Sequence, residues 1–266
     1  MSSSNYDLSD LNSALANTIY FNKLHYFPEI ASTNTAAMQV AAGGAEEGAV
    51  FLADQQTAGR GRNGHAWHSD PGAAILVSVV LRPRIAAEQS LWLSLMAGVA
   101  AHNAISRTCG IFCDLRWPND LLIGKRKVCG VLTEISAEAE RLRFAVIGVG
   151  ININQSAFPA EIAGLATSLA IETGKAWPRT ELLVALLESL QAEYLRALTH
   201  NGSATLLRQV ETISSYVRGK RVYVDEAGGY EGVTDGLDER GFLQVRTRDS
   251  VRKVLSGGVR ELSASR

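Results

Sequence analysis

The sequence predicts an α+β fold in which helices pack on a mixed sheet, followed by a small all-β domain. Over most of the chain, apolar runs of strand length alternate with segments of helical spacing, and hairpins lie between the helices. After about residue 216 the pattern changes to short strand-like runs separated by Gly-rich turns, which is typical of a small barrel or sandwich. We therefore place the domains at 1–215 and 216–266.

The first elements lie on either side of a polar tripeptide. The first half of the stretch FNKLHYFPEIASTNTAAMQVAAGG, which begins at Phe21, is expected to be extended, with Pro28 ending the run. Ser32 or Thr33 then caps a helix, which the pair Gly43–Gly44 stops.

The later elements follow from the same kinds of pattern. Strand-length apolar runs end at Pro or Gly, and the helices carry stripes of leucine on one face. We expect strands at 48–56 and 73–83, a helix at 88–107 that stops before Gly110, a strand, turn and hairpin over 111–135, a buried strand at 141–154, and helices at 180–198 and 204–216. Residues 1–20 carry no strong signal.

Composition restricts the class of protein. The 266 residues are 46% hydrophobic, enough for one large core or a core plus a satellite domain. A formal net charge of −1 implies no general nucleic-acid or anionic-membrane partner. The polar N-terminus argues against a secretory signal, and the longest apolar runs are too short to span a bilayer. We expect a cytoplasmic protein whose three cysteines are buried or partly buried free thiols.

The tripeptide Ser32-Thr33-Asn34 is the first of four candidate site segments. Its three short hydrogen-bonding side chains suit a neutral polar group such as a urea or an amide. Plain helix capping explains the same residues, and their spacing alone favours it.

In the second segment, QTAGRGRNGHAW at 56–67, Arg60 and Arg62 alternate with glycines. Glycines let the backbone approach a ligand, and guanidinium groups add bidentate bonds to phosphate or carboxylate oxygens. A solvated surface turn is the alternative. The sequence has no P-loop motif, so a nucleotide would be held in another way. His65 and His68 are expected to be solvated loop residues and not a metal pair.

The third and fourth segments are RWPNDLLIGKRKVCG and IGVGININ. In the third, Arg116, Asp120 and Lys127 bring two cations and a carboxylate near a strand end. An Asp beside phosphate-binding cations suits magnesium, although a plain turn is equally compatible. In the fourth, two closely spaced glycines leave room on a buried strand for a flat ligand, or for close packing of the backbone.

Taken in order, the segments STN, QTAGRGRNGHAW, RWPNDLLIGKRKVCGVLTE and GVGININ resemble the biotin protein ligases from about Phe27 to Asn154. The later GVTDGLDERGFLQV and SGGVREL resemble the closing domain of that family, which implies an SH3-like β domain. The resemblance implies a reaction in two steps. Biotin and ATP, with Mg²⁺, give biotinyl-5′-AMP and diphosphate, and the adenylate then modifies a lysine of a biotin carboxyl carrier domain.

The resemblance also implies roles for single residues. Those expected to bind biotin or its adenylate are Ser32, Thr33, Asn34, Gln56, Arg60, Gly61, Arg62, Trp67, Arg116, Gly148 and Gly150. The first four would hold the ureido ring, and the last two glycines would form the floor of the pocket. Trp67 would pack as the loop closes.

The catalytic cations implied by the resemblance are Arg60, Arg62, Arg116 and Lys127. They would neutralise the biotin carboxylate and the phosphates of ATP, and Asp120 would bind Mg²⁺. The residue before W-P-N-D is usually lysine in the family, and here it is Arg116.

Alternatives and absent functions complete the prediction. About 25 residues precede the catalytic region, too few for the helix-turn-helix domain of many members, so we expect no DNA binding. Lipoate ligases and octanoyl transferases share the fold, but their pocket takes an alkyl chain and should not need the polar tripeptide. A biotin-sensing protein without turnover is the other alternative. An edge strand would allow a homodimer.

Overall fold

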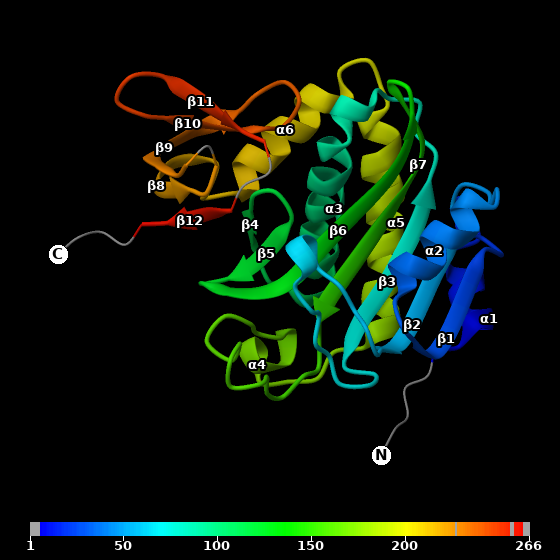
Figure 1. Cartoon of the computed structure of the whole chain (residues 1–266). Coiled ribbons are helices and arrows are strands. Elements are labelled where there is room, and N and C mark those ends of the chain that lie inside the picture. The colour runs from blue at the N-terminus through cyan, green and yellow to red at the C-terminus, as the bar shows by residue number, and fades with distance from the viewer. Residues whose placement is uncertain (1–5, 227, 256–257, 263–266) are drawn as a thin grey trace.

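The computed structural model describes residues 6–226, 228–255 and 258–262 (Figure 1). The first five residues, and two residues of the C-terminal SGGVREL motif, lie outside this part. The larger sheet has seven strands in the order β1-β2-β3-β7-β6-β5-β4. β1 and β2 pair in parallel and the other neighbours are antiparallel, so the predicted mixed sheet is confirmed. Its strands are β1 (Leu24–Ile30), β2 (Val50–Gln56), β3 (Ala74–Leu81), β4 (Asp114–Arg116), β5 (Asp120–Ile123), β6 (Arg126–Glu138) and β7 (Arg141–Asn152).

Helices cover the two faces of this sheet unequally (Figure 1). α3 (Leu91–Cys109) and α5 (Arg179–Ala197) pack together on one face, over the large apolar core. α2 (Thr33–Ala42) packs on β2, β3 and β7 from the other side, over a smaller apolar cluster. Shorter helices are α1 (Leu8–Ala14), α4 (Leu169–Thr173) and α6 (Gly202–Ile213). Among the described residues, no helix combines the length and the apolar character needed to cross a membrane.

The C-terminal part forms a second, all-β sheet. Its five antiparallel strands stand in the order β11-β10-β9-β8-β12. They are β8 (Arg218–Val224), β9 (Tyr230–Leu237), β10 (Leu243–Arg246), β11 (Val251–Val254) and β12 (Val259–Glu261). Buried valines and leucines of this sheet join the same apolar cluster as α3 and α5. The boundary at 215/216 therefore divides two sheets that share a core, and independent folding of each part stays a prediction.

Proline does not end the first strand. β1 continues through Pro28 to Ile30, so that expectation is wrong. β1 is an edge strand, and its register pairs Phe27 with Ala53 and Glu29 with Gln55, on either side of the proline. An edge strand tolerates proline where the missing N–H would face away from the neighbouring strand.

The N-terminal segment contains a helix that the sequence reading missed. The Asp7 carboxylate accepts hydrogen bonds from the backbone N–H groups of Ser9 and Asp10 and so caps α1. Leu11 and Leu15 are fully buried in the large core. The signal was an Asp followed by leucines at helical spacing, but seven residues are too few for the periodicity to stand out.

Candidate functional site

A small cavity of about 50 Å³ lies on the α2 face of the larger sheet, beside the N-terminus of α2. It brings together all four segments that the sequence singled out. The predicted residues that line it are Ser32, Thr33, Asn34, Gln56, Arg60, Gly61, Arg62, Trp67, Lys127, Gly148 and Gly150. Arg116 and Asp120 line an adjoining cavity instead.

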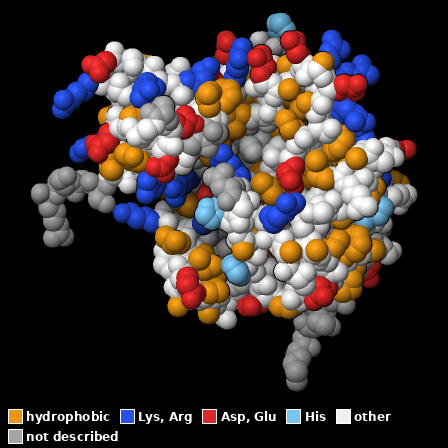
Figure 2. Space-filling view, in the orientation of Figure 1, with side chains coloured by type: hydrophobic (Ala, Val, Ile, Leu, Met, Phe, Trp, Pro, Cys, Tyr) orange, Lys and Arg blue, Asp and Glu red, His pale blue; other side chains and the backbone are white. Residues whose placement is uncertain are grey.

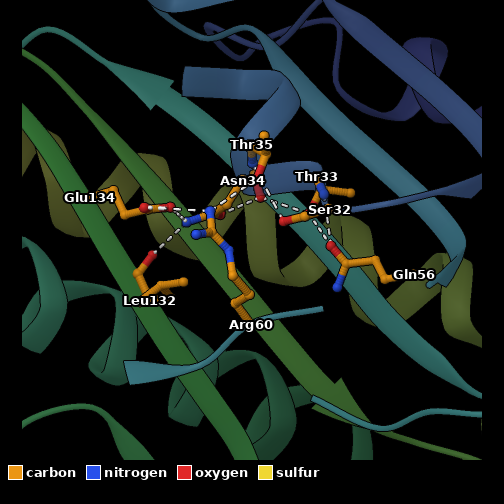
Figure 3. Close-up of polar contacts among 9 residues, drawn as sticks. Ser32, Thr33, Asn34, Thr35, Gln56, Arg60, Leu132 and Glu134 are labelled. Atoms are coloured by element: carbon orange, nitrogen blue, oxygen red, sulfur yellow. Dashed lines mark hydrogen bonds and ion pairs between the residues drawn. The ribbon is translucent and has the colours of Figure 1, made fainter. Parts of the chain in front are cut away.

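The start of α2 is fixed by two polar side chains. Ser32 is the N-cap, and its Oγ accepts a hydrogen bond from the Thr35 backbone N–H at 3.4 Å, so the capping interpretation holds for this residue. The backbone N–H and the Oγ1 of Thr33 both donate to Gln56 Oε1, at 2.7 and 3.0 Å. Gln56 at the end of β2 therefore orients the tripeptide from the side (Figure 3).

Asn34 is held between two strands of the sheet (Figure 3). Its Nδ2 donates to Glu134 Oε2 at 2.9 Å and to the Leu132 carbonyl at 3.3 Å. Its Oδ1 accepts from Ser78 Oγ at 2.6 Å, and the Ser78 side chain is fully buried. Asn34 is itself only 4% exposed, so these bonds fix the direction of its amide.

Three glycines make the space that the site residues fill. A Cβ on Gly148 would lie 2.1 Å from Asn34 Oδ1, and one on Gly150 would lie 2.7 Å from the Trp67 ring. Gly130 pairs with Gly150 across β6 and β7, and a Cβ there would lie 2.8 Å from Lys127 Cε. These glycines line the cavity, and the space above them is taken by Asn34, the Trp67 indole and the Lys127 side chain.

Residues 59–67, here called the Gly–Arg loop, form a hairpin over this cavity. The Gly61 N–H donates to the His65 carbonyl at 2.7 Å, and the Trp67 N–H donates to the Gly59 carbonyl at 2.9 Å. A 3₁₀ turn, Arg62–Gly64, forms its tip. The indole of Trp67 lies on the sheet, over Gly130 and Gly150.

The two arginines of the loop reach in different directions. Arg60 Nη2 donates to Thr35 Oγ1 at 3.0 Å and lies 3.8 Å from Glu134 Oε1, at the α2 end of the cavity (Figure 3). Arg62 Nη1 donates to Asn119 Oδ1 at 3.2 Å, on the W-P-N-D turn. The structure thus does not bring the two guanidinium groups onto one point.

A second cavity, of about 780 Å³, opens beyond the loop. Its walls are the Gly–Arg loop, the W-P-N-D turn and the C-terminal sheet. The C-terminal residues that line it are Asp225, Gly258, Val259 and Arg260. Figure 2 shows Lys and Arg side chains gathered where the C-terminal sheet meets the larger domain.

Lys127 lies at the junction of the two cavities and lines both. Its Nζ lies 2.6 Å from Asp120 Oδ1 and 5.6 Å from the centre of the Trp67 ring. Burial lowers the pKa of the nearby Arg62, and the Asp120 carboxylate opposes that shift, but a guanidinium group remains charged in proteins. Two cations, Lys127 and Arg62, therefore stand at the junction.

Arg116, which is expected near the biotin carboxylate and the α-phosphate, lines the outer cavity and not the smaller one. β4 is the other edge strand of the sheet. The register places Arg116 opposite Asp120 on β5, and Asp120 opposite Gly130 on β6. Two strand spacings, about 10 Å, separate Arg116 from β6. Its Nη2 donates instead to the Val259 carbonyl of the C-terminal sheet at 3.1 Å.

Sequence reasoning missed four residues of the site. Ser78 was hidden in the apolar run AAILVSVVL, where a lone serine in a buried strand was the available signal. Asn119 was treated only as a turn residue. Glu134 and Gly130 lie within the segment RWPNDLLIGKRKVCGVLTE but were not singled out, because their places follow from the pairing of β6 with β7.

Neither the loop histidines nor the cysteines line the inner cavity, although His65 lines the outer one. His65 and His68 have exposed side chains, as expected. Cys109, Cys113 and Cys129 are free, and burial raises the pKa of Cys109 to about 11. The described residues hold no group of three or more His, Cys, Asp or Glu side chains placed to bind a metal ion.

The chain is similar to known proteins of one family. Residues 26–152 match the biotin/lipoate A/B protein ligase family. The bifunctional ligase/repressor BirA of Bacillus subtilis is 33% identical over 256 residues, 94% of this chain and 78% of that protein. The biotin–[acetyl-CoA-carboxylase] ligase of Mycobacterium tuberculosis is 33% identical over 84% of this chain and 83% of its own length. The biotin protein ligase from Aquifex aeolicus in complex with biotin and ATP superposes with a TM-score of 0.79, at 29% identity, over 91% of this chain and 100% of that chain.

Proposed function

Because this chain belongs to the biotin/lipoate A/B protein ligase family, we propose that it uses ATP to attach biotin to a lysine of a biotin carboxyl carrier domain. Biotinyl-5′-AMP is the intermediate. Relatives named as biotin–[acetyl-CoA-carboxylase] ligases and a ligase structure containing biotin and ATP support this activity.

The change along the site, from neutral polar groups near Asn34 to cations that also line the outer cavity, carries the proposal. At one end, the Ser32–Asn34 segment and Gln56 offer neutral hydrogen-bonding groups, which suit a ureido ring. At the other end, Lys127 and Arg62 offer cations. Biotin has a ureido ring at one end and a carboxylate at the other, so its two ends match the two ends of the site.

The first chemical step takes place where the cavities meet. An oxygen of the biotin carboxylate attacks the α-phosphorus of ATP, and the bond to diphosphate breaks. Both reactants are anionic, and charge gathers on the phosphoryl oxygens in the transition state, so fixed cations lower the barrier. Lys127 and Arg62 line both cavities and would be these cations. Arg116 lines only the outer of the two, where ATP would lie.

The second step is transfer to the acceptor. The neutral lysine amine attacks the acyl carbon of the adenylate and loses a proton to solvent, an amide bond forms, and the acyl–oxygen bond breaks so that AMP leaves with the bonding electrons. Water competes for the same acyl carbon, so the Gly–Arg loop must cover the adenylate until the acceptor arrives. The outer cavity, which the C-terminal sheet borders, is the side left for the acceptor.

A magnesium ion fits one carboxylate in the outer cavity. Mg²⁺ is commonly held by one or two carboxylates together with substrate phosphates, and Asp120 supplies one carboxylate beside Lys127. Asp120 would therefore hold the ion together with ATP. Bound there, it would supply positive charge that neutralises the phosphate oxygens.

Biotin entry requires movement of the loop. Ligand pockets usually measure about 300–1,000 Å³, and the inner cavity is about 50 Å³. The Trp67 indole fills the space over Gly130 and Gly150. We propose that Trp67 leaves this place when biotin enters and that the loop then closes again over the ligand.

Partners and location extend the proposal. ATP as a substrate and three free thiols favour the cytoplasm. A net charge of −1 gives no support for DNA binding, although some relatives are named as repressors. A salt-resistant, biotin-dependent shift of operator-like DNA would contradict that expectation. The homodimer stays a prediction.

One assay separates this function from its alternatives. The protein is incubated with ATP, an acceptor domain, and labelled biotin or labelled lipoate. We expect biotinyl-AMP and diphosphate without the acceptor, and labelled acceptor when it is added. Transfer of lipoate but not biotin would identify the lipoate-type enzyme. Biotin binding without diphosphate release would identify a sensor and end the proposal.

A further inference from the structure

The Gly–Arg loop is fastened at two places by its two arginines. Arg62 holds the tip to Asn119 on the W-P-N-D turn. Arg60, which precedes the tip of the loop, holds that side of the loop to α2, because its Nη2 donates to Thr35 Oγ1 at 3.0 Å. The Arg60 guanidinium therefore lies at the neutral, ureido end of the cavity and not at the junction where phosphate would lie.

Glu134 connects Arg60 to Asn34, which lines the inner cavity. One oxygen of its carboxylate accepts from Asn34 Nδ2 at 2.9 Å, and the other lies 3.8 Å from Arg60 Nη2 (Figure 3). Thr35 and Asn34 are neighbours at the start of α2. Glu134 does not line the cavity, so it acts on the ligand only through these partners.

From this geometry we propose that Glu134 is a positioning residue that couples closure of the Gly–Arg loop to the orientation of Asn34, with Arg60 as the latch. This inference rests on the proposed function, because Asn34 is taken to bind biotin. It assigns the two arginines different tasks. Arg62 faces the chemistry as well as holding the tip, and Arg60 is the fastening that is coupled to Asn34.

The strength of the latch suits a loop that opens in each turnover. The Arg60 side chain is 52% exposed and the Glu134 side chain 31% exposed, at a separation of 3.8 Å. An ion pair of this kind is weak, so thermal motion breaks it readily. The Asn34–Glu134 bond is shorter and less accessible to water. Glu134 is thus firmly placed on the Asn34 side and loosely bound on the Arg60 side.

The coupling follows from one shared carboxylate. A biotin that bonds to Asn34 holds the amide, and the amide holds Glu134 in the position that attracts Arg60. Reciprocally, a closed latch keeps Glu134 where it orients Asn34 for biotin. Biotin should therefore promote closure, and loss of the latch should speed the escape of biotin.

Two substitutions at Glu134 separate its two contacts. Glu134→Gln keeps a carbonyl oxygen that accepts from Asn34 but loses the charge that attracts Arg60. Glu134→Ala loses both. Trypsin cleavage after Arg62, followed by mass spectrometry, measures loop opening with and without biotin. We expect Glu134→Gln to be cleaved about threefold faster than wild type without ligand.

Kinetics should distinguish positioning from a merely structural role. For Glu134→Ala we expect the KM for biotin in adenylation to rise about tenfold, with kcat little changed. Protection from trypsin by biotin should then need a correspondingly higher biotin concentration. An Arg60→Gln/Glu134→Gln double variant should be cleaved no faster than Arg60→Gln alone, because each change removes the same contact.

Glu138→Gln is the matched control. Glu138 lies on the same strand, its side chain is 82% exposed, and it lies 3.9 Å from Arg143. This variant should behave as wild type in every measurement. Wild-type cleavage and wild-type KM in Glu134→Gln and Glu134→Ala would overturn the inference. If wild type itself makes no biotinyl-AMP, the proposed function fails, but cleavage without ligand still tests the latch.

Discussion

Because Gly130 has no side chain, the charged end of Lys127 can lie directly over it on the sheet. The register between β5 and β6 shifts near Leu121, so Lys127 lies out of the regular alternation along β6. A β-bulge of this kind re-aims a side chain. The Lys127 ammonium then occupies the space above Gly130, at the junction of the two cavities.

Lys127→Gln should therefore reduce the first chemical step strongly. It keeps most of the side-chain length and removes the charge. We expect biotinyl-AMP formation to fall about 10²- to 10³-fold, as for loss of one preorganised donor. Diphosphate release in single turnovers measures the step. An unchanged rate would remove Lys127 from the mechanism.

Arg116 on β4, two strands away from Lys127 on β6, supplies the comparison. Arg116→Lys restores the usual family residue and should keep substantial activity. Arg116→Ala should lose activity, and the loss should appear mainly as a higher KM for ATP, because the side chain lines only the outer of these two cavities. Diphosphate release over a range of ATP concentrations separates KM from kcat. A full loss of biotin binding in Arg116→Ala would contradict its placement.

Gly150→Ala should displace Trp67. The added Cβ would lie 2.7 Å from two atoms of the indole, closer than packed atoms approach, so the ring must move. We expect a changed Trp67 fluorescence signal, measured as the difference from the corresponding Trp67→Phe variant, and an affinity for biotin at least about tenfold weaker. Gly164→Ala is the control, since no atom lies within 4 Å of the added Cβ. Equal spectra for Gly150→Ala and wild type would count against the packing of Trp67 over Gly150.

At the scale of elements, local signals fixed most of the helices and strands in advance. Ser32 caps α2, and Gly110, in the left-handed conformation, ends α3 as expected. The expectation that the strand ends at Pro28 was wrong, because the effect of a proline depends on whether its strand lies at the edge of a sheet. Local sequence does not contain that information. The site shows the same limit. Segments could be recognised, but the partners Ser78 and Glu134 are set by strand pairing over long sequence separations.

The Gly–Arg loop is the element on which sealing depends. Arg62→Gly removes the bond to Asn119 at the tip, while Arg60 stays. Chemistry at phosphorus should slow but persist, and the loop should open more often, so biotinyl-AMP should escape into solution. A biotin blot of an unrelated lysine-rich protein, incubated with the variant, biotin and ATP, measures the escape. If the variant forms the adenylate yet labels the bystander no more than wild type, Arg62 serves catalysis alone.

At the scale of the whole molecule, the C-terminal sheet is part of the site and of the core. Trp117 Nε1 donates to the Gly241 carbonyl at 2.9 Å, and Arg116 bonds to Val259. Leu95 of α3 packs so closely on Gly241 that a Cβ there would lie 2.7 Å away. The sequence predicted the change of fold near residue 216. It did not predict the contacts of Trp117, Arg116 and Leu95 with the C-terminal sheet, because composition carries no information about which surfaces meet.

Removing the C-terminal sheet should therefore impair both stability and ligation. A chain ending at residue 215 would expose Trp117 and Leu95, which are 5% and 0% exposed in the whole structure, and would lose one wall of the outer cavity. We expect it to unfold at a lower temperature, with biotin binding retained below that temperature and transfer to the acceptor largely lost. Calorimetry, biotin titration and acceptor labelling measure the three effects. Trp117→Phe in the full chain is the control, because it removes the Gly241 hydrogen bond but keeps the apolar contact and the wall. Its activity should stay near wild type. Wild-type transfer by the shortened chain would show that the sheet only stabilises the fold, whereas loss of biotin binding at temperatures where that chain is folded would place the ureido site under its control.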